Sequence, residues 1–498
     1  MRRQPAQPYI DGLLLGGTVL AVWLADIIWI TRETRPPHWD MGRHLWTSLL
    51  YQSDFHAHRL LPLLQDYHYY PPLVYWAVLP WYHWFGTTIP VAVASNLLFI
   101  AILLVSVYAL GRHLGGRTVG LTAAILTAGY PMLVTQFKEF QLDAPLTAMV
   151  TLALGLLVYS EGFRKPRYTL AFGVAFGLGM LTKWTFVVCI ALPALVCLVQ
   201  AIAADIQRRS PKRLMIIAVA ALLAYAVASP WYVANLQQFR IDMKANGTSQ
   251  AILEGDPLVG SLASNVWYLK NLLTEQLFLP NVLLFIVGLG VFIRSWPRRL
   301  EYWYPILLIG GMYLAFTAIA NKDPRYTLPM LPAIAVISVW WLSRLKRRSR
   351  LIAAAAVAIY SGLMFATISF GTRALPQDLS FTVAQTPIRV YAQRGYIIGP
   401  PTQEHWYQQQ MVELAAAQSA GNRGLLYSGP DTIWFNSWGL SYYTQRYGVP
   451  LATSSRNAGV MALRGSHNTS TPSPGFRLTR HYQLPDGSQL WIYTKEKP

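Results

Sequence analysis

Two acidic residues that follow long apolar runs are the first candidates for chemistry in this chain. Asp40 lies in the stretch Pro-Pro-His-Trp-Asp-Met-Gly-Arg-His after the first run, and Asp143 lies in Gln-Leu-Asp-Ala-Pro-Leu after a later one. If the runs cross a membrane, each carboxylate sits where a charge is costly unless a site uses it. The two acids therefore predict one site, provided that both lie on the same side of the membrane.

The composition indicates a membrane protein with many spans. Of the 498 residues, 53% are hydrophobic and only 13% are charged, and apolar runs recur from Tyr9 to Phe370. A run of about 20 residues crosses a hydrocarbon core ~30 Å thick. Cys189 and Cys197 lie inside one apolar run, so we expect them to act as small hydrophobes. The net charge of +19 comes largely from short loops between the runs, which favours membrane topology over nucleic-acid binding.

The basic loops assign the two sides of the membrane. Arg2 and Arg3 place the N-terminus in the cytoplasm, and about eleven spans then make every second loop the basic one. Leu73–Phe85 is too short to cross upright, so we expect it to lie in the outer leaflet; if it crossed, the number of spans would rise. The predicted spans are 9–30, 91–109, 119–134, 146–159, 168–181, 185–202, 214–229, 277–293, 304–320, 326–342 and 351–370.

This topology predicts two domains and puts both acids outside the cytoplasm. Residues 1–370 form the membrane domain, with an external first loop at 31–72 and a long external loop at 231–275, before which Pro230 is expected to stop a helix. From Gly371 the sequence becomes polar, and residues 371–498 are predicted to be a small extracytoplasmic α/β domain. The elements expected there are strands at Gly424–Ser428 and Leu490–Thr494 and a helix at Val412–Gln418.

Five short motifs in order carry a family resemblance. They are Asp40-Met-Gly-Arg43, Tyr70-Pro-Pro-Leu-Val-Tyr-Trp76 with Phe85-Gly86, Asp143 with Pro145, Gly177-Leu-Gly-Met-Leu-Thr-Lys183, and Arg325-Tyr-Thr-Leu-Pro-Met-Leu-Pro332. Together they resemble the GT-C glycosyltransferases of the protein O-mannosyltransferase and lipid A aminoarabinose transferase superfamily. The resemblance spans most of residues 9–345.

The resemblance implies a polytopic α-helical GT-C fold with about 11–13 transmembrane helices. It also implies inverting transfer of a sugar from a polyprenyl-phosphate donor to a glycan, lipid or protein acceptor outside the cell membrane. Such a transfer needs a base on one side of the anomeric carbon and a stabilised phosphate on the other. Asp40 is the candidate base or acceptor-orienting acid, and Asp143 is the second catalytic candidate.

The resemblance also implies a set of binding residues. The candidates for the donor phosphate or substrate are Arg43, Tyr67, His68, Tyr70, Lys183, Arg325 and Tyr326. Relatives of the aminoarabinose type carry Lys directly before Pro-Pro, where this chain has Tyr70, so Arg43, Lys183 or Arg325 must replace that charge. Lys183 has the alternative of an interfacial anchor. Met41 stands where an acid commonly follows the first Asp, which argues against a paired-carboxylate metal site in the first loop; a divalent ion elsewhere stays open.

Two other classes of function fit parts of the sequence. A polyprenyl-linked sugar flippase or transporter would also have many spans and membrane charges. However, the apolar segments show no repeated halves, and the acids gather at one face instead of the midplane. A non-catalytic partner in polysaccharide assembly would predict the loss of Asp40, and Asp40 is present.

The topology can be tested with an impermeant thiol reagent on intact cells. Ser349→Cys, in a basic loop, should be shielded, whereas Ser428→Cys, in the C-terminal domain, should be labelled. Labelling of Ser349→Cys from outside would contradict the number of spans and the shared face of the two acids.

Overall fold

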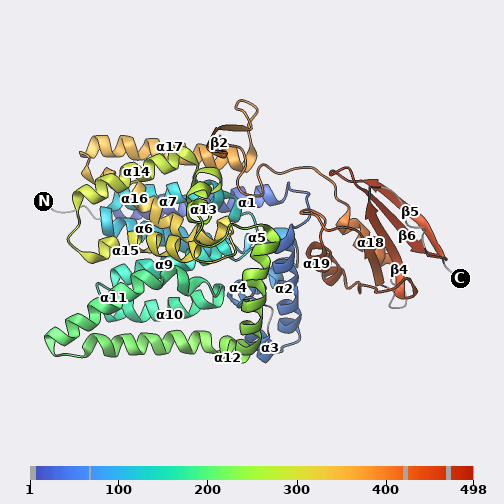
Figure 1. The fold of residues 1–498 in the computed structure, drawn as a ribbon, viewed down its shortest axis with the longest axis horizontal. Helices are drawn as coiled ribbons and strands as arrows, with labels where there is room; N and C mark the ends of the chain where they lie inside the picture. Colours follow the sequence, from blue (N-terminus) through green and yellow to red (C-terminus); the bar gives the residue numbers. More distant parts are fainter. Residues whose placement is uncertain (1–6, 67–68, 419–423, 467–472, 497–498) are drawn as a thin grey trace.

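The computed structural model describes residues 7–66, 69–418, 424–466 and 473–496, and Figure 1 shows a bundle of helices followed by a small domain that contains the C-terminal sheet. The helices of the first part are α1 Gln7–Ile30, α2 Trp39–His56, α3 Leu60–Gln65, α4 Leu73–Phe85, α5 Ile89–Ala94, α6 Leu97–Gly115, α7 Arg117–Ala128, α8 Pro131–Gln136, α9 Asp143–Tyr159, α10 Pro166–Thr182, α11 Phe186–Arg208, α12 Lys212–Glu254, α13 Leu262–Asn271, η1 Leu272–Gln276, α14 Phe278–Ser295, η2 Leu300–Trp303, α15 Tyr304–Thr317, η3 Pro324–Met330, α16 Leu331–Ser338, η4 Trp340–Arg344 and α17 Arg347–Phe370.

Several of these helices have the length and composition of membrane spans. Among the described residues, seven segments qualify: Tyr9–Ile30, Ile89–Gly115, Phe186–Arg208, Lys212–Met243, Phe278–Ser295, Pro324–Arg344 and Arg347–Phe370. The other four predicted spans fall on the shorter helices α7 with α8, α9, α10 and α15. The prediction of a multi-pass helical membrane protein is therefore confirmed.

The prediction that Pro230 ends a helix is wrong. Helix α12 is 43 residues long and continues through Pro230, so the first half of the predicted loop 231–275 is helical. A proline inside a helix loses one hydrogen bond and costs about 3 kcal/mol. Packing offsets that cost, because Trp231 is buried and its indole donates to the carbonyl of Asp66, while the Tyr232 hydroxyl donates to the carbonyl of Met180.

The predicted first loop, residues 31–72, is also largely helical, and its helix α2 packs against the C-terminal domain. Helix α4 covers the short apolar segment that we predicted to lie in the outer leaflet. Helix α2 packs against α19 (Ser437–Tyr447) of the C-terminal domain. A Cβ atom on Gly42 would lie 2.7 Å from the backbone nitrogen of Gly439, so the two helices can approach this closely only without a side chain there.

The C-terminal part begins after α17 with a hairpin, β1 Asp378–Val383 and β2 Thr386–Ala392, that contacts α14 and η1. A four-stranded sheet follows in the order β3-β4-β6-β5, with β3 parallel to β4 and the other pairs antiparallel. Its strands are β3 Gly424–Ser428, β4 Ala458–Gly465, β5 Phe476–Gln483 and β6 Gln489–Lys495, accompanied by α18 Gln408–Gln418 and α19. The two predicted strands and the predicted helix are confirmed.

A buried ion pair joins α1 to the segment before α9. Asp26 and Lys138 are each about 1% exposed, and Lys138 Nζ lies 3.0 Å from Asp26 Oδ1 and donates to the carbonyl of Val134. The aromatic ring of Phe365 lies 5.0 Å from the same nitrogen. The ion pair therefore holds the segment that precedes Asp143 against α1.

Removal of Lys138 should destabilise the protein. In Lys138→Met the carboxylate of Asp26 stays buried without its cation, which typically costs about 3–5 kcal/mol. We expect a marked fall in the melting temperature of the detergent-purified protein, and the double variant Asp26→Leu/Lys138→Met should recover most of it. Lys270→Met, at an exposed position of α13, is the control. An unchanged melting temperature for Lys138→Met would contradict a structural role for the pair.

Candidate active site

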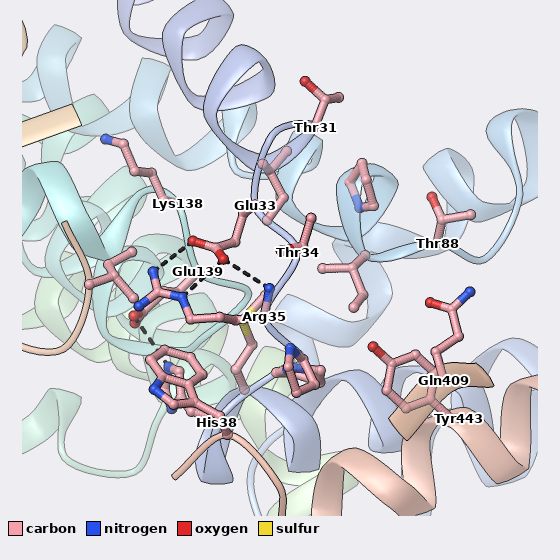
Figure 2. Close-up of a pocket in the computed structure, with 18 of the residues that line it drawn as sticks. Thr31, Glu33, Thr34, Arg35, His38, Thr88, Lys138, Glu139, Gln409 and Tyr443 are labelled. Carbon is pink, nitrogen blue, oxygen red and sulfur yellow. Dashed lines mark hydrogen bonds and ion pairs between the residues drawn. The ribbon is translucent and has the colours of Figure 1, made fainter. Parts of the chain in front are cut away.

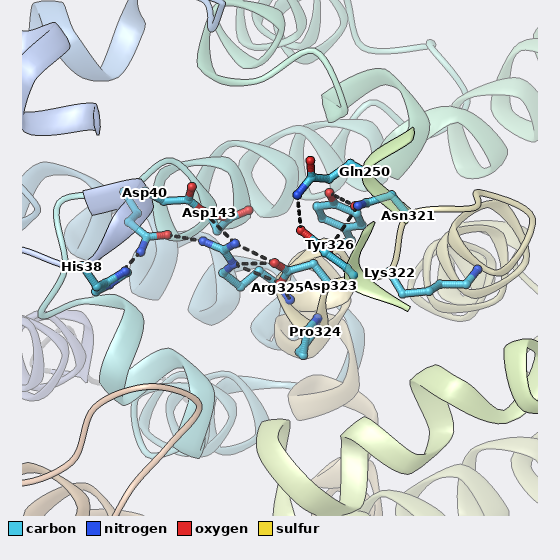
Figure 3. A network of polar contacts seen from close by, with 12 residues as sticks. His38, Asp40, Asp143, Gln250, Asn321, Lys322, Asp323, Pro324, Arg325 and Tyr326 are labelled. Carbon is cyan, nitrogen blue, oxygen red and sulfur yellow. Dashed lines mark hydrogen bonds and ion pairs between the residues drawn. The ribbon is translucent and has the colours of Figure 1, made fainter. Parts of the chain in front are cut away.

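The site lies where the ends of several helices meet, and Figure 3 shows its polar network. Asp40 and Arg43 come from the first turns of α2, and Tyr70 stands shortly before α4. Asp143 is the first residue of α9, and Lys183 directly follows α10. Arg325 and Tyr326 belong to η3, whose first turn is capped by the side chain of Asp323.

Arg325 is the centre of the first group of contacts. Its Nη2 lies 2.8 Å from Asp40 Oδ2 and 2.6 Å from Asp323 Oδ2, and its Nε donates to Asp323 as well. Its Nη1 donates to Gln141 Oε1 at 2.7 Å. Arg325 is therefore engaged on most of its N–H groups, and it holds the carboxylate of Asp40 in place although that side chain is 48% exposed.

Asp143 and Lys183 form the second ion pair of the site. Lys183 Nζ donates to Asp143 Oδ1 at 2.8 Å, and both side chains are less than 10% exposed. The same ammonium group lies 5.8 Å from the ring of Tyr70 and 5.6 Å from the ring of Tyr326. Lys183 thus has an ion-pair partner inside the site, which a simple interfacial anchor would not need.

Arg43 has a different environment. Its guanidinium carbon lies 4.6 Å from the ring of Tyr69, 5.7 Å from Tyr70 and 5.1 Å from Trp438 of α19. No carboxylate lies within ion-pair distance of Arg43 among the described residues, so here its charge is balanced only by aromatic faces. Arg43 and Lys183 flank Tyr70, the residue that replaces the expected lysine.

The charges of the site determine the protonation of its groups outside the spans. Desolvation raises the pKa of Asp40, but the positive charge and hydrogen bond of Arg325, with nearby His44, outweigh it and hold that pKa well below its usual range. Burial, with Arg43, Lys183 and Arg325 nearby, lowers the pKa of His44 to about 3, against the opposing effect of Asp40. Burial raises the pKa of the Tyr70 hydroxyl. At neutral pH, Asp40 is therefore ionised and His44 is neutral.

The structure thus brings together seven of the nine site residues predicted from the sequence: Asp40, Arg43, Tyr70, Asp143, Lys183, Arg325 and Tyr326. The other two, Tyr67 and His68, lie outside the described residues. Within the part of the chain that the structure describes, no three His, Cys, Asp or Glu side chains are grouped so that they could hold a metal ion.

Two residues of the network were missing from the sequence-based set. Asp323 and Gln141 both contact Arg325, and each precedes a predicted site residue by two positions. That spacing gives no helical or strand pattern that would have singled them out. Only the fold, which brings the start of η3 beside the start of α9, reveals their role.

Part of the chain is similar in sequence to known proteins. A family model described as dolichyl-phosphate-mannose-protein mannosyltransferase matches residues 70–233, which include Tyr70, Asp143 and Lys183. A relative from Aquifex aeolicus (strain VF5), described as an uncharacterized protein, is 27% identical over 290 residues. That match covers 55% of this chain and 53% of the relative, so the alignment spans about half of the relative's length.

Solved structures match over almost the whole chain. The crystal structure of ArnT from Cupriavidus metallidurans bound to undecaprenyl phosphate has a TM-score of 0.64 at 15% identity, with 98% of both chains covered. The apo state of the same protein has a TM-score of 0.61, also at 15% identity and 98% coverage of both chains. The chain therefore has the fold of these ArnT structures, and its residues 70–233 match the mannosyltransferase family model. In this chain, the charges close to the ring of Tyr70 come from Arg43 and Lys183.

Proposed function

We propose that this protein transfers a sugar from a polyprenyl-phosphate donor to a hydroxyl group of an acceptor at the extracytoplasmic face of the cell membrane, with inversion at the anomeric carbon. The observation that supports it most is the meeting of two acidic side chains with three basic ones at one site of a GT-C fold. A neighbour of the same fold was crystallised with undecaprenyl phosphate, which supports a polyprenyl phosphate as the donor carrier.

The donor phosphate binds between Arg43 and Lys183. Arg43 has no carboxylate among its described contacts, and Lys183 has N–H groups left after its bond to Asp143. Both cations face Tyr70, so a phosphate beside that ring could contact the two together. Arg325 is less suited to this role, because Asp40, Asp323 and Gln141 already occupy its donors.

Asp40 acts on the acceptor. Its carboxylate is ionised, half exposed and held by Arg325, so it can accept a hydrogen bond from an incoming hydroxyl. In the proposed step the acceptor oxygen attacks the anomeric carbon, the bond from that carbon to the phosphate oxygen breaks, and polyprenyl phosphate leaves. The hydroxyl proton passes to Asp40 and then to water. Because its pKa is low, Asp40 is a weak base. It therefore first orients the acceptor hydroxyl as a hydrogen-bond acceptor and takes the proton afterwards.

Asp143 keeps the phosphate-binding lysine in position. Its carboxylate is only a few per cent exposed and is paired with Lys183, so it has little access to an acceptor. We therefore assign it a positioning role beside the reaction, with Tyr326 packing against the same ammonium group.

Variants of the two cations test the donor site. Arg43→Met and Lys183→Met should each weaken binding of a polyprenyl-phosphate sugar about tenfold or more, since one charged hydrogen bond is worth about 1.5–3 kcal/mol. Donor binding and sugar transfer are measured on the full-length protein in detergent. Arg477→Met, at an exposed position of β5, is the control and should behave as the wild type.

Unchanged donor affinity in Arg43→Met, Lys183→Met and their double variant would contradict the assignment of both residues to the phosphate site. A second assay, on the protein reconstituted into vesicles, distinguishes the flippase alternative. A wild-type protein that moves the lipid-linked sugar across vesicle membranes without transferring it would contradict the proposed function.

A further inference from the structure

The hairpin β1–β2 exposes an apolar face. Leu379, Phe381 and Val383 alternate along β1, and each is 50–53% exposed. The extra residue at the irregularity of the strand register lies in β2, so the alternation along β1 is unbroken. Because successive side chains of a strand point to opposite faces, these three side chains share one face of the hairpin.

The opposite face of the hairpin is polar and contacts the protein. Arg389 of β2 lies opposite Ser380 in the register and is 7% exposed. Its Nη1 lies 2.8 Å from Glu275 Oε2 of η1 and donates to the carbonyl of Thr274, and its Nε lies 3.2 Å from Asp378 Oδ2. A two-stranded hairpin in water normally packs its apolar face on the protein and exposes its polar face. Here the polar face contacts η1 instead, so the apolar face is turned away from η1.

The base of the hairpin is fixed at the ends of two membrane spans. Ala392, the last residue of β2, is buried in a cluster with Phe278, the first residue of α14, and with Met364 and Ile368 of α17. Both helices have the length and composition of spans. Figure 1 shows the hairpin projecting beside α17, apart from the four-stranded sheet. The hairpin therefore stands at the depth where these two spans end.

This is also the end of the bundle that carries the candidate site. Gln276 of η1, the segment that Arg389 contacts, donates to the carbonyl of Pro324 and to Thr327 Oγ1 in η3. The same η3 carries Arg325. The hairpin is thus connected to the candidate site through η1.

The C-terminal domain packs elsewhere on the bundle. It meets the first loop around a cavity of about 490 Å³ that is lined by side chains of both parts, among them Arg35 of the first loop and Tyr443 of α19 (Figure 2). The main contacts of the hairpin are instead with α14 and η1. The described parts of the chain therefore leave the apolar face of β1 open.

Lipid is the cover that the surroundings of the hairpin provide. The spans α14 and α17 expose apolar side chains such as Ile286 and Leu363, as expected of helices that face hydrocarbon. The segment between α17 and β1 adds Arg373, which is exposed, and Leu375, which is 49% exposed. Apolar side chains beside a cation are typical of elements that lie in the lipid headgroup layer.

We propose that the apolar face of β1 lies in the headgroup layer, at the end of the spans that carries the candidate site, and anchors the hairpin to the membrane surface. Leu379, Phe381 and Val383 are then buried against the upper parts of the acyl chains. Arg373 extends from the end of α17 and contacts lipid phosphates.

Spin labels on single-cysteine variants test the anchor in the full-length protein, reconstituted into vesicles of phosphatidylethanolamine and phosphatidylglycerol. Power-saturation EPR measures how accessible each label is to oxygen, which concentrates in lipid, and to a water-soluble nickel chelate. The variants of the apolar face are Leu379→Cys, Phe381→Cys and Val383→Cys, and those of the polar face are Ser380→Cys and Thr382→Cys.

Three controls accompany these variants. Ser428→Cys, at an exposed position of the C-terminal domain, gives the accessibility of a label in water. Cys189 and Cys197 are buried, so the unsubstituted protein gives the background labelling. An unchanged melting temperature shows that each variant is folded.

We expect the ratio of oxygen to chelate accessibility to alternate along β1 with the period of a strand. It should be several-fold higher at the three apolar positions than at Ser380, Thr382 and Ser428. Adding Phe381→Glu should bring the label at Val383 close to the ratio of the aqueous control, because a carboxylate is costly among acyl chains. Adding the matched change Thr382→Glu, on the polar face, should leave that ratio unchanged.

Two results would overturn the anchor. If the labels on the apolar face reach the chelate as freely as the label at Ser428, this face lies in water. If those labels are shielded from both reagents, a protein surface covers the face, and spectral broadening that disappears on dilution with unlabelled protein would identify a second copy of this chain. The measurement requires no sugar transfer, so its outcome is independent of the proposed function.

Discussion

A charge buried near the end of a membrane helix is costly without a partner, and ion pairs organise the end of the helix bundle that carries the candidate site. Asp40 on α2 is held by Arg325 on η3, Asp143 on α9 by Lys183 after α10, and Asp26 on α1 by Lys138. Each pair joins elements that are far apart in the sequence. Because a buried charge without its partner is strongly destabilising, the pairs fix the relative positions of the helix ends that carry the site.

The cations of the candidate site differ in their partners, and we assign them different roles for that reason. Arg325 is surrounded by two carboxylates and an amide, so it holds Asp40 and has little capacity left for a ligand. Arg43 is held by aromatic rings from the first loop and from α19, and a phosphate would be its first anionic partner among the described residues. Through the contact of Trp438 with Arg43, the C-terminal domain also contributes to the proposed donor site.

The membrane class and most residues of the candidate site could be predicted from the sequence, because the length of apolar runs and the order of short motifs can be read directly along the chain. These signals are sufficient to select Asp40, Asp143, Lys183 and Arg325 as candidates. The continuation of α12 through Pro230 could not be predicted in this way. Packing of Trp231 and Tyr232 against distant segments outweighs the tendency of proline to end a helix. The contacts of Asp323 and Gln141, and the cavity between the two domains, depend on tertiary structure and leave no periodic pattern.

The measurement that tests the central role of Asp40 most directly is sugar transfer by Asp40→Asn from a defined polyprenyl-phosphate donor, with donor binding measured in parallel. The substitution keeps the shape of the side chain and removes its charge and its basic oxygen. Since general bases typically contribute about 10²–10⁴-fold, we expect transfer to fall by that order while donor binding persists. Asp323→Asn, which removes the other carboxylate on Arg325, should have a smaller effect. Near-normal turnover in Asp40→Asn would contradict the account.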